Sequence, residues 1–483
     1  MSGAPRKHRI PQRNENGAKA MTGYSWERLC LCRIGPSASE SAIKYDRGHY
    51  APVLRGQINV VYGAPIALPW GGSLREKHDT VIIGGGQAGL AMSHHLRQRG
   101  REHIILERRR VAERWRTERW DSLRFQLPNS WLELPGKPYA GSDPNGFTHH
   151  SDVVRFIVDY AAEIAAPVRT GVEVTSLSPG EGSSGYSLET TDGQINARHV
   201  VIATGPFQRP MIPDFSRAIT SYVYQTDATH YRNPAELPPG AVLIIGSGNS
   251  GCQIADELLH SGRRVFLAVS RHSRVPRRYR GKDVIWWYEH LGRFDVNIDT
   301  FPGRRYPPTT IMTGVDGGYD LDPGRLGSAG VTLLGRVVGI KDGSLALADD
   351  AEKLLAAADH SYAAFIEAAD ILAATPAMRS EVEQTEPPAP QPLLSVDDIR
   401  TLNLREQNIG TIIWANGHGF SFDWVKLPIV DAKGTPVQQR GVTACPGIYF
   451  LGLHWMHTFR SAIFSFVGRD ASYLADHIDH LAP

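Results

Sequence analysis

Two glycine-rich segments of the same design constrain the fold of this chain more than any other feature of its sequence. They begin 162 residues apart, at Gly84 and Gly246, and each follows an apolar stretch typical of a buried strand. A helical pattern and then a second strand follow each segment, the second strands lying at 103–107 and 264–270. The order strand, loop, helix, strand therefore predicts two α/β units with parallel strands.

The glycine spacing in both segments is typical of a dinucleotide-binding loop. Backbone N–H groups and the N-terminus of a helix bind a pyrophosphate. The first glycine of the motif allows a tight turn, the second lets the backbone approach the phosphate, and the third lets the helix pack on the strand. The expected contacts are Gly84, Gly86, Gln87, Ala88 and Gly89 in the first loop, and Gly246, Gly248, Asn249, Ser250 and Gly251 in the second. The sequence therefore predicts two Rossmann-like domains.

The ends of the two second strands distinguish the two ligands. Glu107, with Arg108 beside it, lies where a carboxylate accepts a hydrogen bond from a ribose 2′-hydroxyl, which suits FAD or NAD. The second unit has Ser270-Arg271 at this place, and Arg271 can bind a 2′-phosphate, aided by Arg274, Arg277 or Arg278. The same arginines also fit a solvated surface. We therefore expect FAD in the first domain and NADPH in the second.

The length of 483 residues exceeds what one core usually supports and favours more than one domain. Residues 1–75 lack a sustained hydrophobic period, so we expect a disordered or loosely packed extension, with a transit peptide as the alternative. We expect the FAD-binding domain at 76–210 and 395–483, with the NADPH-binding domain inserted at 211–394. The strand at 199–205 closes the first unit and places Gly205 near FAD, and the strand at 411–417 is its counterpart on the return.

Composition narrows the class of protein further. A net charge of +2 gives no strong attraction to nucleic acid or anionic lipid, and no apolar run reaches the length of a membrane span. Four cysteines do not make a disulfide framework, and His454 and His457 lack the partners of a metal site. We therefore expect a cytoplasmic protein without a metal. The oligomeric state is left open.

The chain resembles the flavin-containing monooxygenases, and most of all the bacterial flavoproteins labelled as potassium-transport-associated, which are related to plant YUCCA-type enzymes. Beyond the two glycine loops, the similarity extends over 76–483 and includes Trp115-Arg116, Trp120-Asp121-Ser122-Leu123, Leu127-Pro128-Asn129, Tyr231-Arg232-Asn233-Pro234, Pro276-Arg277-Arg278-Tyr279-Arg280-Gly281 and Gly447-Ile448-Tyr449-Phe450-Leu451-Gly452.

The resemblance implies that NADPH reduces the flavin and that O₂ then forms a flavin hydroperoxide. This species transfers one oxygen atom to a nitrogen, sulfur or carbonyl centre of a small organic substrate. It also implies that Asn129 contacts the flavin or its hydroperoxide, and that Trp115 and Gln126 lie along FAD. The cofactor supplies the chemistry, so no protein nucleophile is required.

One motif of the family is altered in this chain. The pattern F-x-G-x-x-x-H-x-x-x-(F/Y) precedes the second glycine loop in family members, whereas this chain has Ser221, Val223 and Asp227 at its first three fixed positions and keeps only Tyr231. His230 has the wrong offset and is interpreted as a loop histidine. The change leaves an NADPH-dependent flavin reductase or oxidase as an alternative, and a non-catalytic FAD-binding redox sensor as another. A disulfide reductase would need a dithiol, and the only close cysteine pair is Cys30 and Cys32 in the extension.

Overall fold

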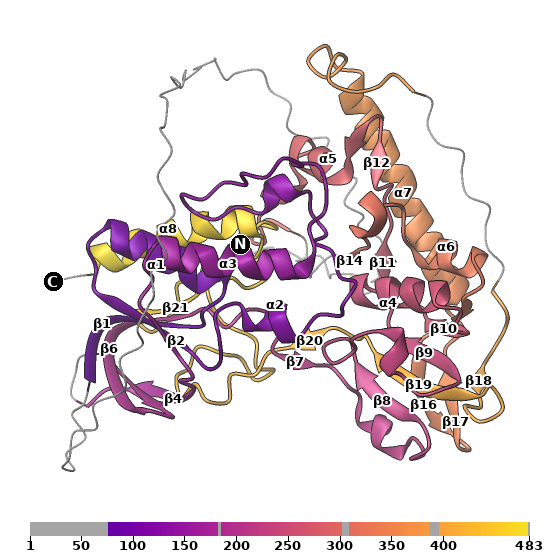
Figure 1. Cartoon of the computed structure of the whole chain (residues 1–483), viewed down its shortest axis with the longest axis horizontal. Helices are drawn as coiled ribbons and strands as arrows, with labels where there is room; N and C mark the ends of the chain where they lie inside the picture. The colour runs from indigo at the N-terminus through magenta and orange to yellow at the C-terminus, as the bar shows by residue number, and fades with distance from the viewer. Residues whose placement is uncertain (1–75, 182–184, 302–308, 386–395, 482–483) are drawn as a thin grey trace, which may run out of the picture.

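The computed structural model describes residues 76–181, 185–301, 309–385 and 396–481. These residues form two α/β units side by side, the first built around a mixed sheet and the second around a parallel sheet (Figure 1). The expected extension 1–75, with Cys30 and Cys32, lies outside the described residues, as does the proline-rich segment 386–392. The fold class predicted from the sequence is confirmed.

The first sheet is seven-stranded, and β1 lies next to β6 at its centre. The first half of β6 also pairs with antiparallel β5, while its last three residues pair with parallel β21, which comes from the far end of the chain. Helices α1, α3 and α8 gather on one face of the sheet (Figure 1). Their bounds, with those of the strands, are β1 (Glu76–Ile83), α1 (Gln87–Gln98), β2 (His103–Glu107), α3 (His150–Glu163), β3 (Val168–Thr170), β4 (Val174–Pro179), β5 (Tyr186–Thr190), β6 (Gly193–Ile202), β21 (Ile448–Phe450) and α8 (Phe464–His480).

The second sheet is five-stranded, all parallel, in the order β15-β10-β9-β19-β8. Successive side chains of a strand point to opposite faces, so Val242 and Ile244 pack with α4, whereas Leu243 and Ile245 pack with β17 and β18. The bounds are β8 (Tyr224–Asp227), β9 (Ala241–Ile245), α4 (Asn249–His260), β10 (Val265–Ala268), β15 (Thr332–Leu334), β17 (Ser344–Leu347), β18 (Thr401–Leu402) and β19 (Ile409–Trp414).

Strand β19 corrects the expected division of the chain. A return to the first domain at residue 395 would assign β19 to that domain, but its backbone pairs with β8 and β9 of the second sheet. The chain passes between the units twice, at β7 (Arg209–Pro210) and at β20 (His418–Gly419), and these two strands pair with each other. Both lie between the sheets in Figure 1. The return crossing therefore follows Trp414.

A short piece of the first unit is anchored in the second. After α2 (Glu113–Thr117), Trp120 and Leu123 are 4% and 5% exposed, and they pack in the core between α4 and the second sheet. The Arg232 guanidinium donates to the carbonyl oxygens of Thr117 and Arg119, and these bonds connect the loop after β8 of the second unit to this segment. The two units are therefore held together by an apolar anchor as well as by the paired crossings.

The second unit contains further helices and strands beside its five-stranded sheet. They are β11 (His272–Ser273), β12 (Arg278–Tyr279), β13 (Lys282–Asp283), α5 (Val284–His290), β14 (Thr309–Thr310), α6 (Pro323–Ser328), β16 (Val337–Lys341) and α7 (Ala351–Ala373). Trp287 is fully buried between α5 and α7, so the aromatic run Trp286-Trp287-Tyr288 belongs largely to a core. Among the helices of the described residues, none is both long enough and apolar enough to span a membrane.

Candidate functional site

The first glycine loop follows β1 and has the geometry of a phosphate cradle. Gly84 has a φ of +117°, and a Cβ there would lie 2.6 Å from the carbonyl oxygen of Ala203, so only glycine fits. A Cβ on Gly89 would lie 2.0 Å from the carbonyl oxygen of Gly84, which places α1 directly against the strand end. A Cβ on Gly86 would meet nothing within 4 Å, which leaves open space at the helix N-terminus. This loop fits a pyrophosphate.

Glu107 closes the first loop from the end of β2. Its carboxylate accepts from the backbone N–H of Gly85 at 2.8 Å and from that of Arg109 at 2.9 Å. The carboxylate therefore stands beside the glycine loop, where a ribose would meet it. Arg108 is exposed at the same strand end.

The second glycine loop repeats this geometry after β9. Gly246 has a φ of +106°, and a Cβ on Gly251 would lie 1.9 Å from the Gly246 carbonyl oxygen, while one on Gly248 would meet nothing within 4 Å. The Asn249 side chain holds the segment at 310–312, because it donates to the Thr310 carbonyl oxygen and accepts from the Met312 N–H. Ser250 is half-buried in the first turn of α4.

Hydroxyl groups take the place of the carboxylate in the second loop. Ser247 N–H donates to the Ser270 hydroxyl at 3.1 Å, and Ser270 N–H donates to the Ser247 hydroxyl at 2.9 Å. Arg271, directly after them, is exposed. This end of β10 therefore presents a cation and no acid.

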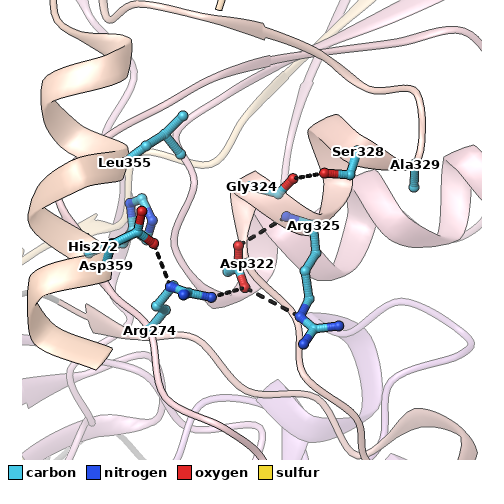
Figure 2. A pocket seen from close by; sticks show the side chains of 10 residues that line it. His272, Arg274, Asp322, Gly324, Arg325, Ser328, Ala329, Leu355 and Asp359 are labelled. Atoms are coloured by element: carbon cyan, nitrogen blue, oxygen red, sulfur yellow. Dashed lines mark hydrogen bonds and ion pairs between the residues drawn. The ribbon is translucent and has the colours of Figure 1, made fainter. Parts of the chain in front are cut away.

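The neighbouring arginines do not join Arg271 as a clamp. Arg274 is buried and pairs with Asp359 at 2.7 Å and Asp322 at 3.6 Å, beside a cavity of about 370 Å³ between α6 and α7 (Figure 2). Arg277 is buried against Asp283 at 2.9 Å. Arg278 donates to backbone carbonyl oxygens at 317 and 318. The help expected from these three arginines conflicts with their contacts, because each guanidinium already has other partners.

The wall from the first loop toward the second unit is aromatic. Gln87 donates to the carbonyl oxygen of Ala462 and accepts from Trp115 at 3.4 Å. The Trp115 ring packs against Phe464 at the start of α8, with centroids 5.9 Å apart. Gln126 meets the second unit, because its carbonyl oxygen accepts from Arg277 at 2.9 Å. Ala88 is buried at the start of α1, and Gly205 follows β6 with a φ of +76°.

The Asn129 side chain forms hydrogen bonds with the backbone of a nearby loop. Its side chain donates to the Asp143 carbonyl oxygen at 2.9 Å and accepts from the Thr148 N–H at 2.7 Å. The side chain is therefore held within the loop that it organises, and Asn129 itself is 5% exposed. Contact with the flavin stays a prediction.

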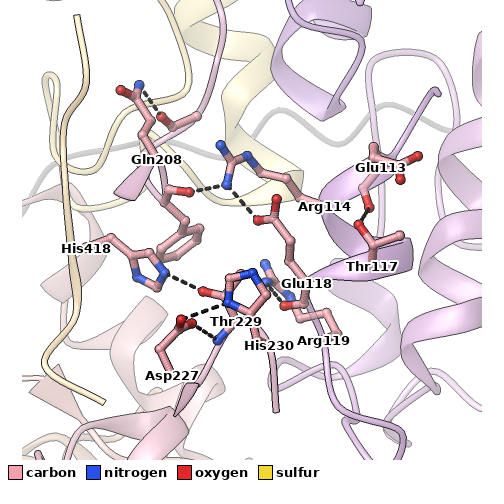
Figure 3. A network of polar contacts seen from close by, with 12 residues as sticks. Glu113, Arg114, Thr117, Glu118, Arg119, Gln208, Asp227, Thr229, His230 and His418 are labelled. Atoms are coloured by element: carbon pink, nitrogen blue, oxygen red, sulfur yellow. Dashed lines mark hydrogen bonds and ion pairs between the residues drawn. The ribbon is translucent and has the colours of Figure 1, made fainter. Parts of the chain in front are cut away.

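The altered family motif forms a polar network at the junction of the units (Figure 3). Asp227, at the end of β8, is 7% exposed; it accepts from Thr229 N–H and lies 2.7 Å from His230 Nδ1. The Thr229 hydroxyl is 3.1 Å from His418 Nε2 on β20. His230 is thus the partner of the carboxylate that stands in the position of the family histidine. Sequence spacing did not indicate this pairing.

Three further residues at the junction were not identified from the sequence as a group. The Arg119 guanidinium stacks on Trp115 at 4.9 Å and on Phe207 at 5.7 Å, and desolvation lowers the pKa of Arg119 to about 10. The Phe207 ring contacts His454, with centroids 5.1 Å apart. Although accessible to solvent, His454 is densely surrounded by protein, and desolvation lowers its pKa to about 4. At neutral pH this histidine is therefore uncharged.

The described cysteines do not form a redox pair. Cys252 and Cys445 are both free thiols, and burial raises the pKa of Cys252 well above its usual value. A buried neutral thiol is a poor nucleophile. In the described part of the chain, no group of three or more His, Cys, Asp or Glu side chains is placed to hold a metal ion.

Comparison with known proteins identifies the family. Residues 81–285 match the model of the pyridine nucleotide-disulphide oxidoreductase family. An uncharacterized CzcO-like oxidoreductase of Geobacillus kaustophilus is 31% identical over 405 residues, which span 83% of this chain and 98% of that protein. The indole-3-pyruvate monooxygenase YUCCA1 of Oryza sativa is 28% identical over 42% of this chain and half of that protein. The chain belongs to the family of this CzcO-like oxidoreductase, and it is related to the flavin monooxygenases.

A solved structure supports the fold. The flavin-containing monooxygenase from Stenotrophomonas maltophilia superimposes with a TM-score of 0.58 at 20% identity, covering 84% of this chain and 99% of that one. The protein is a flavin-dependent oxidoreductase of the monooxygenase type. Its two glycine loops fit the FAD and NADP that such enzymes use.

Proposed function

We propose that this flavin-dependent oxidoreductase uses NADPH and FAD to insert one oxygen atom of O₂ into a nitrogen, sulfur or carbonyl centre of a small organic substrate. NADPH supplies two electrons, one oxygen atom enters the substrate, and the other leaves as water. The observation that carries the proposal is the pair of open glycine loops with opposite charges beside them, Glu107 in one unit and Arg271 in the other.

Bound FAD supplies the redox and oxygen chemistry, and the chain supplies binding, orientation and exclusion of water. Gly86 and Gly248 leave room for the two pyrophosphates, Glu107 receives the FAD ribose, and Ser270 with Arg271 receives the NADPH ribose and its 2′-phosphate. The anchored segment around Trp120 holds the two units, and with them the two glycine loops, together.

A specific observation favours a second candidate, an NADPH-dependent flavin reductase or oxidase that inserts no oxygen. Asp227 stands where family members carry a histidine, and it is buried with His230 as its partner. A carboxylate accepts hydrogen bonds where a histidine can also donate one. The group at this position therefore differs in charge and in donor capacity from the histidine of the family pattern.

The test is to reduce the flavin-loaded protein anaerobically with NADPH or with NADH and then admit air-saturated buffer. Bleaching that is much faster with NADPH, followed by slow reoxidation through a near-ultraviolet absorbance transient, supports the monooxygenase. Product analysis with a panel of amines, sulfides and ketones then identifies the substrate class. Rapid reoxidation with stoichiometric peroxide supports the second candidate. If neither nucleotide bleaches the flavin, both proposals are wrong and a flavin-binding redox sensor is left.

A further inference from the structure

Residues 310–320 of the second unit, here named the bridging segment, contact both the helix after the second glycine loop and the first unit. At the start of this segment, the Asn249 side chain donates to the Thr310 carbonyl oxygen at 3.1 Å and accepts from the Met312 N–H at 2.7 Å. Gln253, one turn later on α4, donates to the Met312 carbonyl oxygen at 2.5 Å. Both polar groups of the Asn249 side chain are therefore engaged by the backbone of the bridging segment.

The middle of the bridging segment packs against the first unit without room for a side chain. A Cβ on Gly314 would lie 2.5 Å from the carbonyl oxygen of Phe125 and 2.7 Å from the Cβ of Phe147. A Cβ on Gly318 would lie 2.9 Å from the Phe147 ring. Gly314 has a φ of −107°, which other residues adopt as well, so the close approach and not a turn requires glycine here. The two units therefore meet closely at Gly314.

The part of the first unit that receives the bridging segment is the loop of Asn129. The Phe125 N–H donates to the Thr148 carbonyl oxygen at 2.8 Å. The Asn129 side chain accepts from the Thr148 N–H at 2.7 Å, and the Asn129 N–H donates to the Gly146 carbonyl oxygen at 2.8 Å. The residues on either side of Phe147 therefore hold Asn129 in place.

Arg277 of the second unit reinforces this contact. Its buried guanidinium lies over the Phe147 ring, 4.2 Å from the centroid, and donates to the Gln126 carbonyl oxygen at 2.9 Å. Its backbone N–H donates to the carboxylate of Asp320, at the end of the bridging segment, at 2.6 Å. The bridging segment and the loop of Asn129 are therefore held together at two places.

We propose that Asn249 is a positioning residue, which holds the bridging segment, and through it the loop of Asn129, at a fixed place relative to the second glycine loop. Hydride transfer needs reacting atoms about 3–3.5 Å apart, and a misplacement of about 1 Å slows such a step strongly. The link would therefore set the place of the NADPH-binding loop relative to the flavin side of the junction. The naming of hydride transfer rests on the proposed function, whereas the link itself rests on the contacts above.

The first test is hydrogen–deuterium exchange of the flavin-loaded protein, in wild type and in Asn249→Ala. The substitution releases the bridging segment from α4, so the loop of the other unit loses part of its support. We expect the amides of Phe125 and Asn129 to exchange about fivefold faster, which corresponds to the loss of about one hydrogen bond. Unchanged exchange at these two amides would overturn the proposal.

The matched control is Asn403→Ala. The Asn403 side chain also accepts from two backbone N–H groups, those of Arg405 and Glu406 at 3.0 and 3.2 Å, but it follows β18 and does not contact the bridging segment. Exchange in the loop of Asn129 should stay at the wild-type rate in this variant. Equal acceleration in both variants would indicate a general loosening of the second unit and would contradict the positioning role.

The second test compares the rate of flavin reduction with nucleotide affinity. In stopped-flow measurements with NADPH, Asn249→Ala should lower the limiting rate of reduction about tenfold or more. The Kd for NADP⁺ from calorimetry should change far less, because the backbone of the glycine loop is kept. Asn249→Asp keeps the acceptor for the Met312 N–H and loses the donor to Thr310, so its rate should be intermediate. An unchanged rate, or a Kd weakened as much as the rate is slowed, would overturn the proposal.

Gly314→Ala tests the link from its other end. The added Cβ would meet the Phe125 carbonyl oxygen and Phe147, so we expect reduction to be slower by about tenfold while FAD is kept. If both residues act through one link, combining Gly314→Ala with Asn249→Ala should slow reduction by less than the product of the two single effects. A full product would show independent effects and would contradict the link.

Flavin content and the thermal midpoint check that each variant is folded. If Asn249→Ala does not fold, Asn249→Asp and Gly314→Ala still decide the outcome. If NADPH does not reduce the wild-type flavin, the proposed function is wrong, and hydrogen exchange, which requires no turnover, decides the positioning role by itself.

Discussion

The two glycine loops have the same backbone conformation but differ in the polar side chains beside them. In both, a Cβ on the third glycine would lie about 2 Å from the carbonyl oxygen of the first, and in both the middle glycine faces open space. The carboxylate of Glu107 closes the first loop, whereas the hydroxyls of Ser247 and Ser270 close the second. Shared sterics therefore make both units dinucleotide sites, and the side chain at the end of the second strand selects which dinucleotide binds.

The largest expected effect comes from replacing the third glycine of each loop, Gly89 or Gly251. Gly89→Ala and Gly251→Ala each force a Cβ into a carbonyl oxygen and so push the helix from its strand. We expect Gly89→Ala to lose FAD. Gly251→Ala should keep FAD, but NADPH should reduce the flavin about 10²-fold more slowly, because a misplacement of the nucleotide by about 1 Å has an effect of this size. Flavin content and stopped-flow reduction measure the two outcomes.

The middle glycines provide the control for this comparison. Gly86→Ala and Gly248→Ala clash with no protein atom, so each should weaken its own nucleotide while the thermal midpoint of the nucleotide-free protein stays unchanged. Loss of FAD from both Gly251→Ala and Gly248→Ala would show that the two loops are not independent.

Replacing the Glu107 carboxylate beside the first loop should have the next largest effect. Glu107→Gln keeps the shape but removes the charge that accepts from Gly85 and Arg109. A hydrogen bond to a charged group contributes about 1.5–3 kcal/mol, so the Kd for FAD should rise by about ten- to a hundredfold. Titration of the apoprotein with FAD measures this. Glu102→Gln, just before the opposite end of β2, is the matched control and should leave the Kd unchanged.

Giving the second loop the charge of the first should change its preference for the reduced nucleotide. Arg271→Gln should raise the KM for NADPH about tenfold with little effect on NADH, because one charge-assisted contact to the 2′-phosphate is lost. Ser270→Glu with Arg271→Gln should favour NADH. Steady-state kinetics with both nucleotides measure the ratio. Arg264→Gln, next to the other end of β10, is the control; an unchanged ratio in the double variant would place the 2′-phosphate elsewhere.

The smallest effect concerns acid stability of the first sheet. Glu76 forms a two-contact ion pair with Arg169, and this partner lowers the pKa of Glu76 to about 2 from 4.5. The pair therefore stabilises the fold above a pH of about 4.5, and the contribution is lost as the pH falls toward 2. Because Glu76 is partly exposed, Glu76→Gln should cost under about 1 kcal/mol at pH 7 and nothing near pH 2. Thermal unfolding at several pH values measures this, and an equal cost at both ends would contradict the ion-pair explanation.

Local chemistry explains what was predictable from the sequence. The positive φ at Gly84 and Gly246 requires glycine, and so does the close approach of a carbonyl oxygen to Gly89 and Gly251. The two loops can therefore be predicted from the sequence. Strands such as β2 and β9 lie where the apolar runs predicted them, because buried parallel strands are apolar on both faces. The charges at Glu107 and Arg271 follow at a set distance along the chain, for the same local reason.

Only the tertiary structure decided which distant residues meet. Trp120 lies within the chain segment of the first unit but packs in the core of the second unit. Strand β19 pairs with the second sheet, although it follows residue 395, where we expected the chain to return to the first domain. The Thr229 hydroxyl meets His418, and the Arg119 guanidinium stacks on Phe207, across a junction that no local pattern encodes. Such contacts depend on how two sheets dock, which is a property of whole surfaces. The sequence by itself therefore determined two dinucleotide folds and their order, and the docking of the two units decided the contacts between them.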